Sequence, residues 1–138
     1  MTHDVFVSFK SEDKEIAEKI CDDLGAKNVN CWISSRGIRG GQNYQEEIVK
    51  ALLGSSIMVL VFSSAADKSD EIAKELSLAS KYKKFVIPVR IEDFKPGIKY
   101  EYEMATRQYI DLFDNWEKKI DQLSTDIKSM MSNIAEVG

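Results

Sequence analysis

Cysteine is scarce in this 138-residue chain, which contains only Cys21 and Cys31. Two cysteines are too few for the disulfide framework that stabilises many small secreted domains, and we interpret both as buried free thiols. Long apolar runs are absent as well, since no segment approaches the roughly 20 residues of a membrane-spanning helix. The N-terminal sequence MTHDVFVSFK lacks the basic and apolar regions of a secretory signal. We therefore expect a cytoplasmic protein without a membrane partner.

The chain also lacks an excess of positive charge. Its 19 Lys and Arg residues against 23 Asp and Glu residues give a formal net charge of −4, so no basic footprint for nucleic acid is present. The only histidine is His3, close to the N-terminus. One histidine and two separated cysteines are too few ligands for a zinc site, and His3 is poorly placed for a Ser–His–Asp triad. We expect no nucleic-acid partner, no metal and no cofactor.

Three phosphate- or nucleotide-binding signatures are missing too. No Gly-x4-Gly-Lys-Ser/Thr loop is present, and the sequence after the first apolar run is KSEDK, without the glycines of a dinucleotide-binding turn. The glycines of SRGIRGGQ follow the second run instead, with the wrong spacing. The third run ends in VFSS, so the aspartate that a phospho-receiver domain places there is absent.

What the sequence does contain is a regular alternation of short apolar runs and helical stripes. The composition, 43% apolar and 30% charged, is typical of a soluble globular domain, and we expect one domain over residues 1–138. Strands are expected at 5–9, 31–34, 56–62, 85–91 and, more weakly, 108–113. Helices are expected at 13–25, after Asn43, at 69–84 and from about Trp116 onward, so that residues 103–138 supply the final strand and a long helix.

This alternation predicts an α/β fold, namely a flavodoxin-like five-stranded parallel sheet in the order 2-1-3-4-5, with helices on both faces. The run SIMVLVF at 56–62 is apolar throughout, as in a central parallel strand covered on both sides. Pro88 marks a bulge or a position near the sheet edge. Asn43 with Glu46, and Asp114 with Glu117, have the spacing of helix-capping pairs. Ligands of such sheets bind at the carboxyl ends of the strands, here residues 9–13, 34–43 and 63–71.

One helix beside this rim carries two carboxylates on the same face. In SDEIAKELSLASKYKK (69–84), Ile72, Leu76 and Ala79 form the apolar stripe, and Glu71 and Glu75 are four residues apart. Like charges at that spacing are mildly unfavourable in an exposed helix. The pair is therefore either an ordinary solvated face, neutralised by Lys68 and Lys74, or the place where one carboxylate performs chemistry.

At this point the chain resembles a known family along nearly its whole length, the Toll/interleukin-1 receptor (TIR) domains. DVFVSFKSED (4–13) resembles the first conserved box, and the stretch from Cys31 to Leu52 resembles the second box with its BB loop. SIMVLVFS is similar to the third strand, and VIPV (86–89) to the Ile-Pro-Val strand. SDEIAKEL resembles the Ser-x-Trp-Cys-x-x-Glu-Leu element, with Glu75-Leu76 as its Glu-Leu.

The resemblance implies one of two functions. Many bacterial, plant and some animal TIR domains cleave NAD⁺ or cyclise its product, and the glutamate of the Glu-Leu element is catalytic; here it is Glu75. Loss of nicotinamide builds positive charge on the ribose, which a nearby carboxylate stabilises. Other members, such as animal receptors and adaptors, only assemble with other TIR domains through the BB loop. The first implication makes this chain an NAD⁺ nucleosidase of the bacterial type that serves as an immune-defence effector; the second makes it a signalling scaffold.

The resemblance also implies binding roles around Glu75. Phe9 and Lys10 match an aromatic–basic pair that would meet a base and the diphosphate. The BB loop, Ser34 to Asn43, would cover the site and dock on a second protomer. Substrate contacts are expected from Ser34, Gly41, Asn43 and Glu71, and partner contacts from Arg36, Ile38 and Arg39.

The chain departs from the family at Glu71, where a tryptophan usually stands four residues before the catalytic glutamate. The change removes a ring that stacks on the ligand, and it is consistent with weaker stacking, a different product or a non-catalytic scaffold. A second carboxylate at this spacing would also raise the pKa of its partner.

Overall fold

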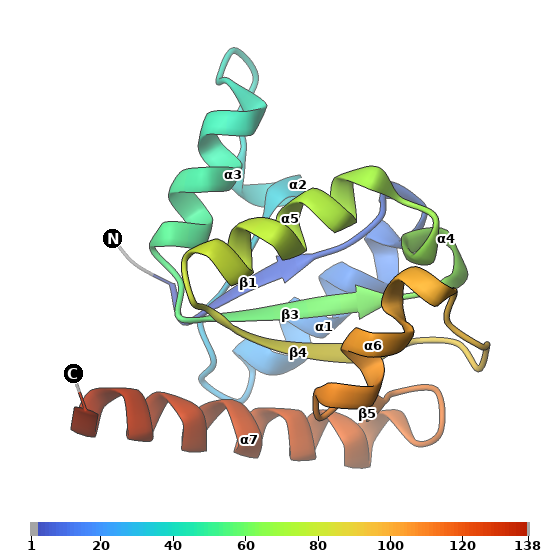
Figure 1. Ribbon diagram of the computed structural model, residues 1–138. Coiled ribbons are helices and arrows are strands. Elements are labelled where there is room, and N and C mark those ends of the chain that lie inside the picture. Colours follow the sequence, from blue (N-terminus) through green and yellow to red (C-terminus); the bar gives the residue numbers. More distant parts are fainter. Residues whose placement is uncertain (1–2, 138) are drawn as a thin grey trace.

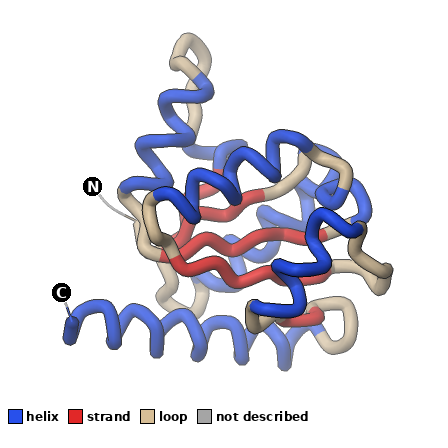
Figure 2. The backbone as a smooth tube through the Cα atoms, viewed as in Figure 1, coloured by secondary structure: helices blue, strands red, loops and turns tan. Residues whose placement is uncertain are grey.

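Five parallel strands form a single sheet in the order β2-β1-β3-β4-β5 in the computed structural model, which describes residues 3–137 (Figures 1 and 2). The strands are β1 (Val5–Ser8), β2 (Cys31–Ile33), β3 (Ile57–Phe62), β4 (Phe85–Arg90) and β5 (Ile110–Asp111). The predicted α/β fold, its strand order and the central position of 56–62 are confirmed. The single-domain prediction for 1–138 includes residues 1–2 and 138, which lie outside the described residues.

Helices connect successive strands, as a parallel sheet requires. They are α1 (Lys14–Gly25), α2 (Ser34–Gly37), α3 (Tyr44–Leu53), α4 (Ser64–Asp67), α5 (Asp70–Lys81), α6 (Ile98–Thr106) and α7 (Trp116–Val137), with a 3₁₀ turn η1 at Ser11–Asp13. The long α7 lies along one side of the sheet in Figure 1.

Each face of the sheet has its own apolar core, because successive side chains of a strand point to opposite faces. Val5 and Val7 of β1 belong to the core that α1 and α7 cover, whereas Phe6 belongs to the core beneath α3, α5 and α6. All six residues of β3 are buried. This two-sided burial explains why that strand is apolar throughout rather than alternating.

The weakest predictions were those for the last third of the chain. The expected strand at 108–113 is reduced to Ile110–Asp111, which pairs only with Val89 and Arg90 of β4. Pro88 therefore lies where β4 has no β5 partner, in agreement with its expected position near the sheet edge. Helix α6 was not predicted, because only Tyr100 and Met104 of its residues are buried.

Local details differ from the sequence-based expectation at two further points. Helix α7 is capped by Asn115, whose side chain accepts a hydrogen bond from the Lys118 N–H at 3.2 Å, and not by the predicted Asp114. Cys21 is buried but Cys31 is only half-buried, and both are free thiols. Within residues 3–137, no helix is both long enough and apolar enough to cross a membrane.

Candidate active site

Glu75 lies in the middle of α5, on a helix whose orientation is fixed by its cap and its apolar stripe. The Ser69 side chain accepts a hydrogen bond from the Ile72 N–H at 3.2 Å and begins the helix. Ile72, Leu76 and Ala79 are buried against the sheet. This packing brings Glu75 to the carboxyl end of β1, where its side chain is only 8% exposed.

Ser8, the last residue of β1, is the direct partner of Glu75. Its hydroxyl donates a hydrogen bond to Oε1 of Glu75 at 2.7 Å, and both residues are buried. Burial raises the pKa of Glu75 to about 7; the Ser8 hydrogen bond lowers it, and the negative charge of Glu71 raises it further. Near neutral pH the carboxyl group is therefore present in both its ionised and its neutral form.

A hollow of about 550 Å³ opens beside Glu75. Its lining comes from the end of β1, the start of α3 and the first turns of α5, namely Phe9, Lys10, Ser11, Asn43, Tyr44, Gln45, Ser69, Glu71 and Glu75. A narrower hollow of about 190 Å³ shares Tyr44, Gln45, Glu71 and Glu75 with it and continues between α3 and α5. Glu75 thus lies at the junction of two adjoining spaces.

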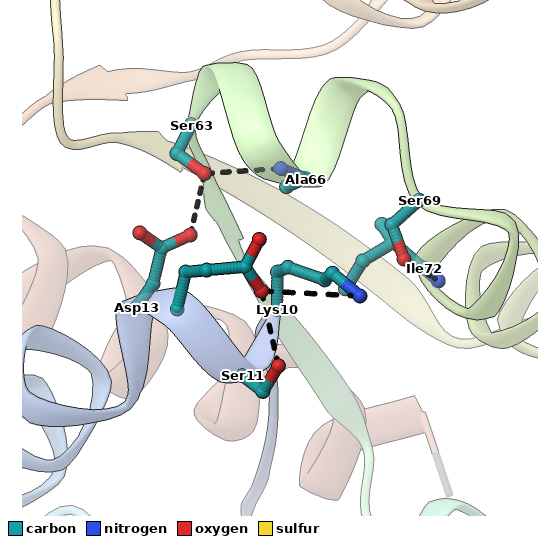
Figure 3. Close-up of polar contacts among 8 residues, drawn as sticks. Lys10, Ser11, Asp13, Ser63, Ala66, Ser69 and Ile72 are labelled. Carbon is teal, nitrogen blue, oxygen red and sulfur yellow. Dashed lines mark hydrogen bonds and ion pairs between the residues drawn. The ribbon is translucent and has the colours of Figure 1, made fainter.

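Polar contacts tie the loops of this rim together (Figure 3). Ser63, which follows β3, accepts a hydrogen bond from the Ala66 N–H at 3.0 Å and donates one to Asp13, which follows β1. The Lys10 side chain extends toward the start of α5 near Ser69, and its ammonium lies 3.9 Å from Glu12. Lys10 is therefore a cation in the lining of the hollow that takes part in one partly exposed ion pair.

A further hollow, of about 490 Å³, lies between α1 and α7, away from Glu75. Several of its polar groups already have partners: the Trp116 Nε1–H donates to Asp23 at 2.6 Å, and Lys27 pairs with Asp121. The space beside Glu75 is the better candidate, because there a buried carboxyl group with a raised pKa faces open volume.

The arrangement around Glu75 can stabilise a positive charge that develops on a bound ligand. The buried carboxylate is shielded from bulk water, so its field is stronger there than at the surface. Lys10, which lines the same hollow, can neutralise an anionic group of the same ligand. No group of three His, Cys, Asp or Glu residues suited to a metal ion occurs among residues 3–137.

The family model of the TIR domain matches residues 5–124, which is most of the chain. This chain belongs to the TIR domain family.

Solved TIR domains share its fold at low sequence identity. The TIR domain of the Toll-related receptor TRR-2 from Hydra magnipapillata has a TM-score of 0.76 at 20% identity, over 92% of this chain and 99% of that one. The TIR domains of the activated Roq1 resistosome, which directly recognises the pathogen effector XopQ, give 0.59 at 22% identity, over 91% and 83% of the two chains. The TIR-STING receptor from C. gigas, in complex with 2′,3′-cGAMP, gives 0.73 at 21% identity, over 91% of this chain but 39% of that receptor.

Five of the residues predicted for the site of this TIR domain line the larger hollow together: Phe9, Lys10, Asn43, Glu71 and Glu75. Glu71 and Glu75 differ in environment despite their shared helix face. The Glu71 side chain is 62% exposed and pairs with Lys74 at 3.4 Å, as expected of a solvated ion pair. Ser34 and Gly41 do not line either hollow beside Glu75.

The BB loop projects away from the body of the TIR domain. Residues 38–43 form the tip above α3 in Figure 1, and of residues 34–43 only Asn43 reaches the larger hollow. The Arg36 guanidinium is paired with Asp22 of α1 at 2.7 Å and lies 3.6 Å from Glu18. Arg36 thus anchors the base of the loop, and its role as a partner contact, like those of Ile38 and Arg39, stays a prediction.

Two residues beside Glu75 were not assigned a role from the sequence. Ser8 was visible only as the serine that ends the first family box, and its hydrogen bond joins residues 67 positions apart in the chain. Tyr44 follows the capping residue Asn43 and lines both hollows. The sequence did offer one signal for Tyr44: it is an aromatic residue that directly follows a predicted helix cap at the sheet rim.

Proposed function

We propose that this TIR domain cleaves NAD⁺ at the nicotinamide–ribose bond, with Glu75 as the working carboxylate, as in the NAD⁺-cleaving, bacterial-type branch of the family. The observation that carries the proposal is the buried Glu75 carboxyl group, held by Ser8 at 2.7 Å and facing a hollow of about 550 Å³. NAD⁺ is the substrate, and the chemistry requires no cofactor.

The reaction begins with departure of nicotinamide, which takes both electrons of its bond to the ribose and needs no proton. The ribose is left with oxocarbenium-like positive charge, which ionised Glu75 stabilises across a short distance. Lys10 is placed to hold the diphosphate at the mouth of the hollow. Water then adds to the ribose and releases a proton, which yields ADP-ribose; capture by an adenine nitrogen of the same molecule yields a cyclic product instead.

The decisive experiment incubates concentrated protein with NAD⁺ and separates nicotinamide and ADP-ribose products by chromatography. Glu75→Gln preserves the size of the side chain but removes its charge, and it should reduce cleavage on the order of a hundredfold or more, equivalent to about 2.7 kcal/mol. Glu71→Gln, on the exposed neighbour, should have a far smaller effect. Turnover by Glu75→Gln equal to that of the unmodified protein would exclude Glu75 as the catalytic group.

The alternative function is a TIR–TIR interaction module without catalysis. The projecting BB loop favours it (Figure 1), as does Glu71 at a position where the family usually has tryptophan. Both functions suit an immune-defence role, because the relatives include a Toll-related receptor and a resistosome that recognises a pathogen effector. Absence of NAD⁺ cleavage at high protein concentration, together with self-association, would favour the interaction module.

A further inference from the structure

Tyr44 carries a large aromatic ring that packs into neither apolar core, while its hydroxyl forms a hydrogen bond with the Ser34 side chain. It is the first residue of α3, fixed there by Asn43, whose side chain accepts a hydrogen bond from the Glu46 N–H at 3.0 Å. Tyr44 is 52% exposed and belongs to neither apolar core of the described chain. Keeping an aromatic side chain half in water forgoes the burial that normally stabilises such residues.

The position of Tyr44 suggests what the ring is for. It lines both the larger and the smaller hollow, each time together with Glu71 and Glu75. The only other aromatic residue in these linings is Phe9, which packs against the core under α1 and α7. Tyr44 is therefore the aromatic side chain that remains available to a ligand beside Glu75.

The charges near Tyr44 define the kind of ring that would bind. Burial raises the pKa of the Tyr44 hydroxyl, the hydrogen bond with Ser34 lowers it, and the nearby charges of Glu75 and Glu71 raise it. An aromatic face and a carboxylate both attract positive charge. The smaller hollow adds the apolar side chains of Ile48, Val49 and Leu78, which suit a flat ring. Lys10 lies in the larger hollow only, where it suits the anionic part of the same molecule.

We propose that Tyr44 and Glu71 form a subsite for a planar, positively charged heterocycle, in which the Tyr44 ring stacks on the pyridinium ring of the ligand. The inference rests on the proposed function for its substrate, and it fixes the orientation: the pyridinium ring lies toward α3 and α5, and the diphosphate toward Lys10. It also gives Glu71 a binding role, because its carboxylate favours the cationic ring over an uncharged one.

One positive group competes for this place. Lys74 lines the smaller hollow and lies 3.4 Å from Glu71. Its side chain is 69% exposed, so it can move into solvent at little cost when a cation enters. Removing its charge should therefore strengthen binding of the cationic ring, which is the opposite of the effect expected at Tyr44.

The test uses 1-methylnicotinamide, a pyridinium cation without a ribose bond to cleave, and compares it with neutral nicotinamide by NMR titration. The unmodified protein should bind the cation several times more tightly than the neutral ring. Tyr44→Ala should weaken cation binding about tenfold, whereas Tyr44→Phe should stay within about twofold. Lys74→Gln should tighten it, and Tyr102→Ala, at an exposed tyrosine of α6, should leave it unchanged.

The outcomes separate this inference from the proposed function. Undetectable binding of the cation, equal affinity for the two rings, or Tyr44→Ala affinity equal to that of the unmodified protein would each overturn the subsite. Tyr44-dependent binding without NAD⁺ cleavage would keep the subsite and refute the catalytic function. Cleavage of NAD⁺ together with cation binding that is independent of Tyr44 would support the catalytic function and refute the subsite.

Discussion

The protonation state of Glu75 is controlled by two neighbours that act in opposite directions. The Ser8 hydroxyl stabilises the ionised form by donating to Oε1, whereas the Glu71 charge and the burial of the site favour the neutral form. Because the pKa is raised to about 7, small changes at either neighbour alter the ionised fraction at neutral pH. The pH at which Glu75 ionises therefore reports on both of these contacts.

The pH dependence of NAD⁺ cleavage should report these two contacts. If ionised Glu75 stabilises the developing charge, activity should rise with pH and level off above about 7. Ser8→Ala removes an influence that lowers the pKa, so the midpoint should move to higher pH. Glu71→Gln removes one that raises it, so the midpoint should move to lower pH. Initial rates over a pH series check both, and shifts in the same direction would contradict the assignment.

Folding stability should depend on the ionisation of Glu75 in the opposite sense to activity, because the fold favours the neutral carboxyl group. The pKa of Glu75 is raised in the fold from 4.5 to about 7, so its favourable contribution is complete below pH 4.5 and is lost as pH rises through about 7. Glu75→Gln removes this loss. At pH 8 the variant should melt several degrees higher than the unmodified protein, a gain of up to about 3 kcal/mol.

The comparison requires melting curves at pH 8 and again at pH 4.5, where the difference should largely disappear. Glu101→Gln, at an exposed carboxylate of α6, should show no such pH-dependent gain. If Glu75→Gln stabilised the fold equally at both pH values, burial would not be what disfavours the ionised Glu75 carboxylate.

Glu75 could be selected from the sequence, but its partners could not. The resemblance to the family's Glu-Leu element singled out Glu75, whereas the apolar stripe of α5 predicted only that the face with Glu71 and Glu75 points toward the ends of the strands. Ser8 and Tyr44 come from distant parts of the chain, and only the parallel pairing of β1 with β3 and the packing of α3 beside α5 bring them there. Such contacts depend on tertiary geometry, which no local pattern contains.

At the scale of elements, burial decided which predictions succeeded. Strand β3 and helix α5 are buried along a whole strand or a whole stripe, and both were located correctly to within a few residues. The two-residue β5 and the half-exposed α6 bury few side chains, so their sequences carry a weak periodic signal. The short α2, at the base of the BB loop, was expected to be loop because of the glycines in this segment.

Gly37 at the end of α2 should be irreplaceable for a packing reason. A Cβ at this position would lie 2.3 Å from Nε1 and 2.5 Å from Cε2 of Trp32, whose ring is stacked on Phe6 with centroids 5.2 Å apart. Gly37→Ala should therefore destabilise the fold by about 1–3 kcal/mol, measured by urea denaturation. Gly40→Ala is the matched control, because a Cβ there meets nothing within 4 Å. Equal stability of the two variants would contradict this packing.

At the scale of the whole molecule, the candidate site and the BB loop lie on neighbouring parts of the surface and meet only at Asn43, the last residue of the loop. The hollow is formed by β1, α3 and α5, whereas the loop extends beyond them (Figure 1). Tyr44 joins the two, since it follows the loop directly in the chain and lines the hollow. A second copy that docks on the loop would therefore act on the site through the start of α3.

We therefore predict that specific activity toward NAD⁺ rises with protein concentration. Gly41, in the exposed tip of the loop, has a φ of +88°, which proline cannot adopt because its ring fixes φ near −65°. Gly41→Pro should change the tip and abolish this rise while leaving the melting temperature almost unchanged, since Gly40, Gly41 and Gln42 are exposed and belong to neither apolar core. Gly40→Ala should behave like the unmodified protein. Rates and light scattering measured over the same concentration range provide the check. Constant specific activity from a protein that stays monomeric throughout would show that the site is complete within one chain.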